Sequence, residues 1–483
     1  MVRALLVLAM CSALCLANGI ERLDGSRITP DEIDALAARL MKSAEVPGLA
    51  IAVVNQGILS YANAYGFRDT DKHLPLTVNS VMDAASLTKV AFAYLVMELV
   101  GQGKLDLDKP VYLYLPKPLP DYPSYADLSG DERYKRITSR MLLSHTSGFP
   151  NWRWIEDDRK LKIHFEPGTR FAYSGEGIDL LQLVVESVTK RPLKDLMQEH
   201  VFEPLGMNRT SLVWQSSFDN DYANGYDEYG RSVGLQRRDK ADAAGSMVTT
   251  VSDFARFLQA TMQGKGLTPK SRQQMLSPQI QIVSKHEFPT FENQTSEQNK
   301  AIRLSYGLGW GLFWTPYGKA YFKEGHDDGE RNYAVCFEDR KTAMLIMTNS
   351  GNGEGIYKGL LEGVLDDTFT PLEWEGFTPY DQLPPRPPLK QYKEVHLDAT
   401  SLSKYVGRYG DPPNLILVIG REGDHLSIQE NDEPKQDLFP ESGGGFFAKS
   451  ADDLFTFDLD AQGRVSKMIL HTEGRDIPLK RID

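Results

Sequence analysis

An apolar stretch at residues 87–100 most strongly limits how this chain can fold. It holds only two charged side chains, Lys89 and Glu98, and Gly101 and Gly103 follow it. Its length and composition predict a helix that is buried on all sides and that ends at the two glycines. Ser86 then lies at the helix start, and Lys89 lies one turn later on the same face. The rest of the chain must therefore build a core around this helix.

The pair of Ser86 and Lys89 suits a nucleophile and its base. The first turn of a helix has free N–H groups and a positive dipole end, which stabilise an oxyanion. A lysine amine one turn away can take the serine proton when burial lowers its pKa. The alternative is a structural role for both residues, in which Ser86 lies near the helix cap and the Lys89 side chain extends out of a core helix. Ser-x-x-Lys on its own is a weak motif.

Length and charge narrow the class of protein. The 483 residues are too many for one core and predict two or three units. A composition of 41% hydrophobic and 25% charged residues excludes a disordered chain and a polytopic membrane protein. The net charge of −12 disfavours nucleic acid or an anionic membrane as partner. We therefore expect a small-molecule or peptide substrate, no nucleic acid and no membrane contact beyond the N-terminal segment; the oligomeric state stays open.

Residues 1–19 have the pattern of a secretory signal peptide. A basic start at Arg3 precedes an apolar run at residues 4–16 and small residues at 17–19. The run is short for a membrane span, although an uncleaved anchor is the alternative. The expected location is periplasmic or secreted. Cleavage would leave Cys336 as the single cysteine, so the mature chain would have no internal disulfide.

The order of the remaining elements predicts an α+β fold. A helix begins at Thr29-Pro30, and the β-rich runs at residues 48–56 and 58–65 form a hairpin. Helical pieces continue to about residue 262, and a second hairpin at residues 332–338 and 342–348 returns to the sheet. We predict an antiparallel sheet flanked by helices, with a helical insertion.

Three segments follow residue 27 in this reading. Residues 28–375 form the α+β domain, and the proline-rich residues 376–395 form a stiff linker. Short alternating strands with turns between them predict a small all-β barrel at residues 396–483, with a sandwich as the alternative. This last segment contains no recognisable chemical constellation.

A set of motifs then occurs in one order along residues 28–370, and this set resembles a known family. The order is that of the serine β-lactamase and penicillin-binding-protein superfamily, in the branch with class C β-lactamases, D-specific peptidases and carboxylesterases. The motifs are Ser86-Leu87-Thr88-Lys89, Leu142-Leu143-Ser144-His145-Thr146-Ser147-Gly148, Glu166-Pro167-Gly168 leading to Tyr173-Ser174, Pro204-Leu205-Gly206-Met207, Ala244-Gly245 with Ser252-Asp253, Tyr306-Gly307-Leu308-Gly309-Trp310 and Gly325-His326. The C-terminal segment resembles the barrel appended to some members.

The resemblance implies a role for each matching residue. Ser86 would be acylated, and Lys89 would take its proton. Tyr173 would relay protons between nucleophile and leaving group, if a nearby ammonium lowers its pKa; a core aromatic is the alternative. The N–H groups of Ser86 and Gly329 would form the oxyanion hole. His145 is expected to bond backbone.

Two departures from the family pattern bear on the substrate. The family's Tyr-x-Asn ends here in Gly175, which removes the amide that would hold the acyl-side amide of the substrate. The family's Lys-Thr-Gly strand motif is aligned with His326-Asp327-Asp328. His326 would serve as a substrate or proton-relay residue, with a histidine bonded to Asp327 or Asp328 as the alternative. Gly175, Asp327 and Asp328 are the expected substrate-binding residues, and two carboxylates there disfavour β-lactams.

The sequence therefore predicts a serine hydrolase of the esterase or D-amino-acid peptidase or amidase type. The alternatives are a β-lactamase or cell-wall D,D-peptidase with weak β-lactam turnover and a non-catalytic penicillin-binding-like protein. No His-Glu-x-x-His pattern or clustered Cys/His spacing occurs, so we expect no metal and no cofactor. Gly-x-Ser-x-Gly is also absent, which argues against an α/β-hydrolase.

Overall fold

The computed structural model describes most of the chain as two compact units. The residues described are 19–234, 237–291, 293–386, 388–411, 415–430, 435–449, 452–472 and 475–483. Unit 1 takes in the chain up to Asn224 and Asp239–Leu383, and unit 2 takes in Gly225–Arg238 and Pro384–Asp483. The predicted signal peptide at residues 1–19 lies outside the described residues except for Gly19.

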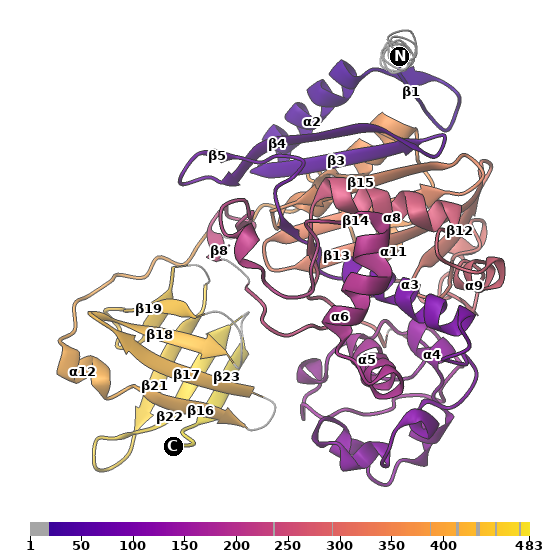
Figure 1. Cartoon of the computed structure of the whole chain (residues 1–483). Coiled ribbons are helices and arrows are strands. Elements are labelled where there is room, and N and C mark those ends of the chain that lie inside the picture. The colour runs from indigo at the N-terminus through magenta and orange to yellow at the C-terminus, as the bar shows by residue number, and fades with distance from the viewer. Residues whose placement is uncertain are drawn as a thin grey trace. The chain divides into compact units, whose positions relative to one another are not determined.

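A nine-stranded sheet is the centre of unit 1 (Figure 1). Every strand pair in it is antiparallel. Its order is β10 (Ile280–Gln281), β11 (Ser305–Tyr306), β12 (Gly311–Thr315), β13 (Gly318–Asp327), β14 (Glu330–Phe337), β15 (Thr342–Thr348), β3 (Gly48–Asn55), β4 (Ile58–Asp69) and β5 (Leu74–Pro75). The two predicted hairpins are thus β3–β4 and β14–β15, and β3 pairs with β15 at the centre.

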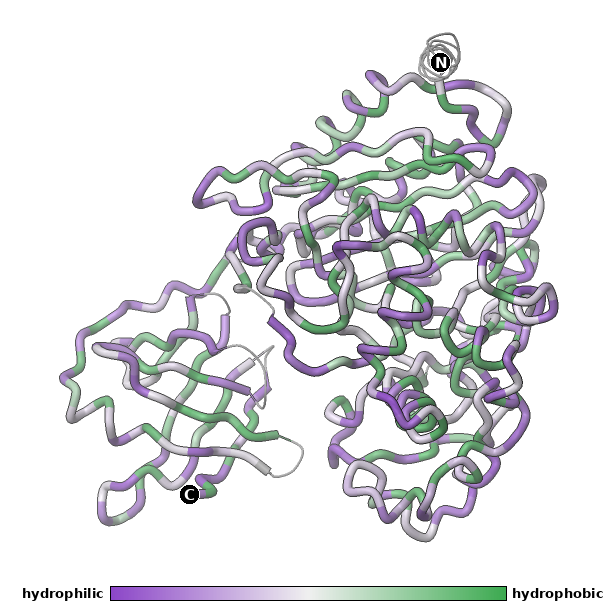
Figure 2. Tube along the Cα trace, in the orientation of Figure 1, coloured by the Kyte–Doolittle hydropathy of each residue, from purple (hydrophilic) through white to green (hydrophobic). Residues whose placement is uncertain are grey.

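Alternate residues of the central strands bury two different cores. In β3, Ala50 and Ala52 face the core that contains helix α3, whereas Leu49 and Ile51 face the core that contains α2. This alternation follows from the two-residue repeat of a strand. The hydropathy colouring of Figure 2 agrees, because the central strands are mainly hydrophobic. The sheet is therefore covered on both faces.

Helices and short turns fill the space on either side of the sheet. Helix α2 begins as the sequence predicts, with Thr29 and Glu32 in a reciprocal cap and Pro30 in the first turn. The α-helices of unit 1 are α2 (Pro30–Ala44), α3 (Leu87–Gly101), α4 (Ser139–Leu143), α5 (Gly175–Thr189), α6 (Leu193–Met197), α7 (Glu203–Leu205), α8 (Val251–Gln263), α9 (Pro269–Met275), α10 (Tyr357–Leu360) and α11 (Leu372–Glu375). Helices α3 to α9 lie between the two hairpins, which confirms the helical insertion.

Smaller sheets complete unit 1. The strands β1 (Ile20–Glu21) and β2 (Arg27–Ile28) form a ribbon before α2. The strands β6 (Met82–Asp83) and β9 (Val248–Thr249) pair just before α3. This second pairing anchors the chain that leads to Ser86. Among the described residues, no helix combines the length and the hydrophobicity that a membrane crossing requires.

Unit 2 is an eight-stranded antiparallel barrel. Its strands follow chain order: β16 (Gly407–Asp411), β17 (Leu415–Glu422), β18 (His425–Glu430), β19 (Gln436–Pro440), β20 (Phe446–Ala448), β21 (Leu454–Leu459), β22 (Val465–Thr472) and β23 (Arg475–Lys480). A bridge between Tyr409 and Arg481 brings the last strand back to the first. The predicted α+β domain and C-terminal barrel are both confirmed; helix α12 (Ala399–Ser403) precedes the barrel.

A hairpin from the middle of the chain belongs to unit 2. It consists of β7 (Gly225–Tyr226) and β8 (Ser232–Gly234). Within unit 2, an Arg231 Nη1 lies 3.0 Å from Asp452 Oδ1, and Arg386 donates to the Glu228 carbonyl. This membership was not predictable from the sequence, because no pattern in a two-strand hairpin links it to a segment more than a hundred residues later.

Candidate active site

Ser86 lies in a tight turn immediately before α3. Ala85 has φ of 46°, a conformation unusual for a residue with a side chain. The Asp83 carboxylate accepts from the Ala85 N–H at 2.7 Å, and Asn332 Nδ2 donates to the Asp83 carbonyl at 3.0 Å. Thr88 closes the turn by donating to the Ala85 carbonyl at 2.6 Å. The turn is thus held by named bonds, and Ser86 is partly exposed between buried neighbours.

Lys89 reaches Ser86 as the helical repeat predicts. Its Nζ lies 2.9 Å from Ser86 Oγ and donates to the Ala244 carbonyl at 2.6 Å. The Lys89 side chain is buried. Burial lowers the pKa of Lys89 to about 8, and the ammonium of Lys323 adds to this effect. A substantial share of Lys89 is therefore neutral near pH 8, as a base for the Ser86 proton must be.

Tyr173 stands just before α5 and faces both lysines. The Lys89 Nζ is 5.1 Å and the Lys323 Nζ 4.7 Å from the centroid of its ring. Burial raises the pKa of Tyr173 in spite of Lys323, so its phenol stays protonated at neutral pH. The expected proton relay depended on a lowered pKa of Tyr173, and the pKa is raised instead because burial outweighs the ammonium of Lys323.

The His145 ring packs against the Tyr173 ring. Its ring lies 4.5 Å from the Tyr173 ring, centroid to centroid. Its Nδ1 accepts from the Ser174 N–H at 3.2 Å, which is the backbone bond expected for this residue. Burial lowers the pKa of His145 well below its usual value, and the two lysine ammonium groups add to this. We therefore assign His145 a positioning role.

Lys323 is the main site residue that the sequence analysis missed. It lies on β13, is fully buried, and its Nζ donates to Tyr173 Oη at 3.0 Å. The same Nζ donates to the Glu324 carbonyl at 3.1 Å and contacts the Glu324 carboxylate. Burial alone would lower the pKa of Lys323, but Glu324 raises it above its ordinary value. Lys323 therefore holds Tyr173 as a charged donor whose charge Glu324 balances.

Gly325 is the β13 residue that packs against the nucleophile turn. A Cβ placed there would lie 2.5 Å from the Ala84 carbonyl oxygen and 3.3 Å from the Leu87 nitrogen. Lys323-Glu324-Gly325 thus has both the Lys-x-Gly spacing and the contacts expected of the strand motif. The prediction that this motif lies at His326-Asp327-Asp328 is therefore three residues too late. The Lys-x-Gly spacing itself was the signal that would have found it.

The other predicted residues of β13 lie further along the strand. His326 has 55% of its side chain exposed, and its Nδ1 is 3.7 Å from Glu354 Oε2. Partial burial and the Arg331 guanidinium lower the pKa of His326. Asp327 ends the strand, and Asp328 is exposed in the turn to β14.

Gly329 was predicted as an oxyanion donor, and the structure places it elsewhere. It is the second residue of the two-residue turn between β13 and β14, with φ of 79°. Gly325, four residues earlier, is the strand residue that packs against the turn containing Ser86. The prediction for Gly329 followed from the misaligned motif. The backbone beside Gly325 is the better position for a second donor.

Three carboxylates gather behind Lys323. The side chains of Glu287, Glu324 and Glu375 are buried, and one oxygen of each lies within 4.8 Å of the others. Burial raises the pKa of Glu287 and of Glu375, and Glu324 adds to both shifts. Carboxylate oxygens suit a hard divalent cation, but here the Lys323 ammonium already contacts Glu324. We interpret Glu324 as the counter-charge of Lys323, beside two carboxyl groups whose raised pKa values favour their protonated form.

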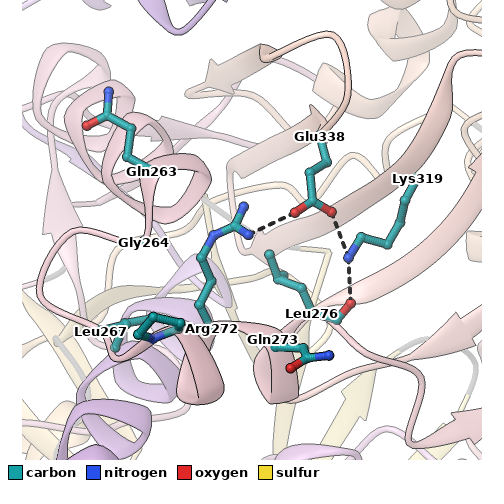
Figure 3. A pocket seen from close by; sticks show the side chains of 9 residues that line it. Gln263, Gly264, Leu267, Arg272, Gln273, Leu276, Lys319 and Glu338 are labelled. Carbon is teal, nitrogen blue, oxygen red and sulfur yellow. Dashed lines mark hydrogen bonds and ion pairs between the residues drawn. The ribbon is translucent and has the colours of Figure 1, made fainter.

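A pocket of about 310 Å³ lies elsewhere in unit 1. Figure 3 shows Arg272 and Lys319 pointing at opposite oxygens of Glu338. The Arg272 Nη1 to Glu338 Oε1 distance is 2.9 Å, and the Lys319 Nζ to Glu338 Oε2 distance is 2.6 Å. These charges satisfy one another, and none of the residues around Ser86 lines the pocket. The reactive groups are therefore outside it.

Comparison with known protein families shows to which family this chain belongs. The sequence profile described as Beta-lactamase matches residues 33–365. The chain belongs to the beta-lactamase family. A second profile, a domain of unknown function (DUF3471), matches residues 391–481 and covers the barrel. Proteins of the beta-lactamase family are serine hydrolases, so Ser86 and its surroundings belong to a serine hydrolase fold.

Individual relatives agree with this family at low identity. Penicillin-binding protein 4* of Bacillus subtilis (strain 168) is 24% identical over 87% of this chain and 92% of its own length. A beta-lactamase of Pseudomonas fluorescens is 28% identical over 48% of this chain and 64% of its own length.

Solved structures show the same fold. The octameric penicillin-binding protein homologue from Pyrococcus abyssi has a TM-score of 0.58 at 21% identity, covering 94% of this chain and all of that one. The D-alanine carboxypeptidase AmpC from Burkholderia cenocepacia has a TM-score of 0.56 at 20% identity, covering 68% of this chain and 97% of that one. The barrel thus has a counterpart in the first structure's full-length match.

Proposed function

We propose that this chain is an exported serine hydrolase that forms an acyl-enzyme on Ser86 and cleaves an ester or the amide of a D-amino-acid derivative. The observation that carries the proposal is the 2.9 Å approach of Lys89 Nζ to Ser86 Oγ in a buried site. Burial also lowers the pKa of Lys89 to about 8, so the amine can act as a base.

The first half-reaction acylates Ser86. Neutral Lys89 takes the Ser86 proton while Oγ forms a bond to the carbonyl carbon of the substrate. The Ser86 N–H at the start of α3 and a backbone N–H near Gly325 stabilise the oxyanion. The bond to the leaving group then breaks, and that group departs with a proton from the Lys89 ammonium, passed through the Tyr173 hydroxyl.

The second half-reaction restores the free enzyme. A water molecule gives a proton to neutral Lys89, passed through the Tyr173 hydroxyl, as its oxygen attacks the acyl carbon. The bond between Ser86 Oγ and that carbon breaks, Oγ regains a proton, and the carboxylic acid product leaves. Throughout, Lys323 keeps the Tyr173 hydroxyl in place by donating to its oxygen.

The charges along β13 favour esters and D-amino-acid amides over β-lactams. Lys323 is buried and its charge is balanced by Glu324, so it offers little to the carboxylate of a β-lactam. Beyond it lie Asp327 at the end of β13 and Asp328 in the following turn, two carboxylates that repel an anionic group.

A substrate panel with a nucleophile variant tests the proposal. The wild-type protein should hydrolyse p-nitrophenyl esters or D-alanyl p-nitroanilide faster than nitrocefin, a chromogenic β-lactam. Ser86→Ala should lose at least about 10³-fold in kcat while its urea unfolding midpoint stays unchanged. Full activity of Ser86→Ala would overturn the acyl-enzyme. Faster turnover of nitrocefin than of any ester or amide would establish the β-lactamase alternative instead.

Export is a separate part of the proposal. Residues 1–19 have a basic start, an apolar run and small residues at the exit. Expression in a secreting bacterial host should give mature protein that begins after Ala17 or Gly19, as read from its intact mass. Protein that keeps Met1 and stays in the cytosol would contradict export and leave the catalytic proposal untouched.

A further inference from the structure

An indole ring occupies the place of the missing side chain at Gly175. A Cβ on Gly175 would lie 2.4 Å from Cη2, 2.6 Å from Cζ3 and 2.7 Å from Cζ2 of Trp152. Only glycine allows this contact, because real Cβ atoms do not approach aromatic carbons so closely. The pattern Tyr-x-Asn in relatives would put an amide here. In this chain the position is instead apolar and aromatic.

Trp152 also lies over the reactive amine. The Lys89 Nζ is 5.8 Å from the centroid of the Trp152 ring. Trp154 stacks on Trp152, with centroids 4.7 Å apart and planes at 9°, and is 58% exposed. Phe288 packs edge-on against the Tyr173 ring at 5.6 Å and is 45% exposed. Large exposed aromatic side chains next to reactive groups usually mark a binding surface.

The segment that carries Trp152 is anchored on both sides. Before it, Asn151 Oδ1 accepts from the Gly175 N–H at 3.0 Å. After it, Arg153 Nε donates to Glu176 Oε1 at 2.8 Å, and Nη1 donates to the Ser124 carbonyl at 2.6 Å. Both anchors hold Trp152 to the first turn of α5. The indole is therefore a preformed surface, which lowers the entropic cost of binding an apolar group on it.

We propose that Trp152, Trp154 and Phe288 form the subsite for the acyl side of the substrate and that they select an apolar, aromatic acyl group. This inference rests on the proposed function and names the substrate class of the same site. An aromatic acyl group gains ring contacts and loses its water contacts there. An acyl group that carries an amide finds no side-chain amide at Gly175, so its own polar groups lose their water without a replacement.

The test compares two esters with the same leaving group. We would measure kcat/KM for p-nitrophenyl phenylacetate and p-nitrophenyl acetate and take their ratio. The wild-type ratio, divided by the ratio of the uncatalysed rates, should be at least about tenfold in favour of phenylacetate. Trp152→Ala should lower the ratio at least about tenfold, and Trp154→Ala by a smaller factor. Phe67→Ala removes an aromatic that is 40% exposed elsewhere and should leave the ratio unchanged.

Labelling of Ser86 by a fluorophosphonate distinguishes failure of the aromatic subsite from failure of the serine hydrolase activity. A Trp152→Ala protein that is labelled normally but keeps the wild-type ratio would overturn the subsite and leave the hydrolase intact. A wild-type protein that neither labels nor hydrolyses either ester would overturn the proposed function first. If Trp152→Ala does not fold, the ratios of Trp154→Ala and Phe288→Ala decide, and wild-type ratios in both would overturn the subsite.

Discussion

Replacing Lys323 by methionine should move the pH dependence of catalysis upward. The Lys323 and Lys89 ammonium nitrogens lie 4.7 and 5.1 Å from one ring centroid. They are therefore at most about 10 Å apart, where two like charges repel by about 1.7 kcal/mol at an effective dielectric constant of about 20. This energy equals about one pKa unit. Without Lys323, the pKa of Lys89 should rise from about 8 by at least about that amount.

The sign of the effect follows from the role of Lys89 as a base. The reactive form is the neutral amine, so kcat/KM of the wild-type enzyme should rise with pH along a limb near 8. A higher pKa means less neutral amine at a given pH, so Lys323→Met should shift the limb to about 9 or above. Initial rates of ester hydrolysis from about pH 6 to about pH 10, corrected for background hydrolysis, would cover both limbs.

A double variant separates this electrostatic effect from damage to the fold. Lys323→Met alone leaves the buried Glu324 unpaired, which costs about 3–5 kcal/mol of stability. Lys323→Met/Glu324→Gln removes both charges; because Glu324 raises the pKa of Lys89, the limb should return towards 8. A folded Lys323→Met protein whose limb stays at the wild-type pH would refute Lys89 as the titrating base.

Two further substitutions test the contacts that position the site. Gly325→Ala would put a methyl group 2.5 Å from the Ala84 carbonyl oxygen, so the nucleophile turn would have to shift. This shift should lower kcat/KM by about 10²-fold, while the circular dichroism spectrum stays that of the wild-type protein. Wild-type activity would contradict the close packing of Gly325 against the turn. Arg153→Met removes the ion-pair partner of the Glu176 carboxylate, which is 6% exposed, and should lower the free energy of unfolding in urea by about 3–5 kcal/mol. The double variant Arg153→Met/Glu176→Gln should regain most of this stability. If it does not, the lost ion pair is not the cause.

Local patterns predicted much of the nucleophile's surroundings. The buried run after Ser86 indicated a helix, and the three-residue spacing then put Lys89 beside Ser86, because both features depend only on the helical repeat. The cap at Thr29 and the two hairpins of the central sheet were also readable, since caps and alternation are local signals.

Contacts between distant segments could not be predicted in the same way. Lys323 meets Tyr173 across 150 residues. The Lys-x-Gly spacing at residues 323–325 marks Lys323 as a candidate, but it does not indicate the contact with Tyr173. Identifying Lys323 as a site residue required the correct alignment of the strand motif along β13. An alignment three residues too late assigned the strand motif to His326 and the second oxyanion donor to Gly329. The position of Trp152 was not predictable either. A glycine at position 175 indicates that a side chain is missing, but it does not identify the residue that fills the space.

The barrel shows a different limit. Its strands were predicted in the right region, but β16, β19 and β23 were not identified. Two of these strands contain a proline (β19 and β23), and β16 contains two glycines, residues that argue against a strand when read locally. Their place in the closed sheet comes from pairing with neighbours, which compensates for weak local preference.

Labelling of the nucleophile tests the central claim most directly. The mature protein and Ser86→Ala would each be incubated with a fluorophosphonate, and their intact masses would be measured. We predict one adduct on the wild-type protein that maps to Ser86 and is absent from Ser86→Ala. An adduct that persists in Ser86→Ala, or no adduct on well-folded wild-type protein, would contradict an activated Ser86 and with it the roles of Lys89 and Tyr173.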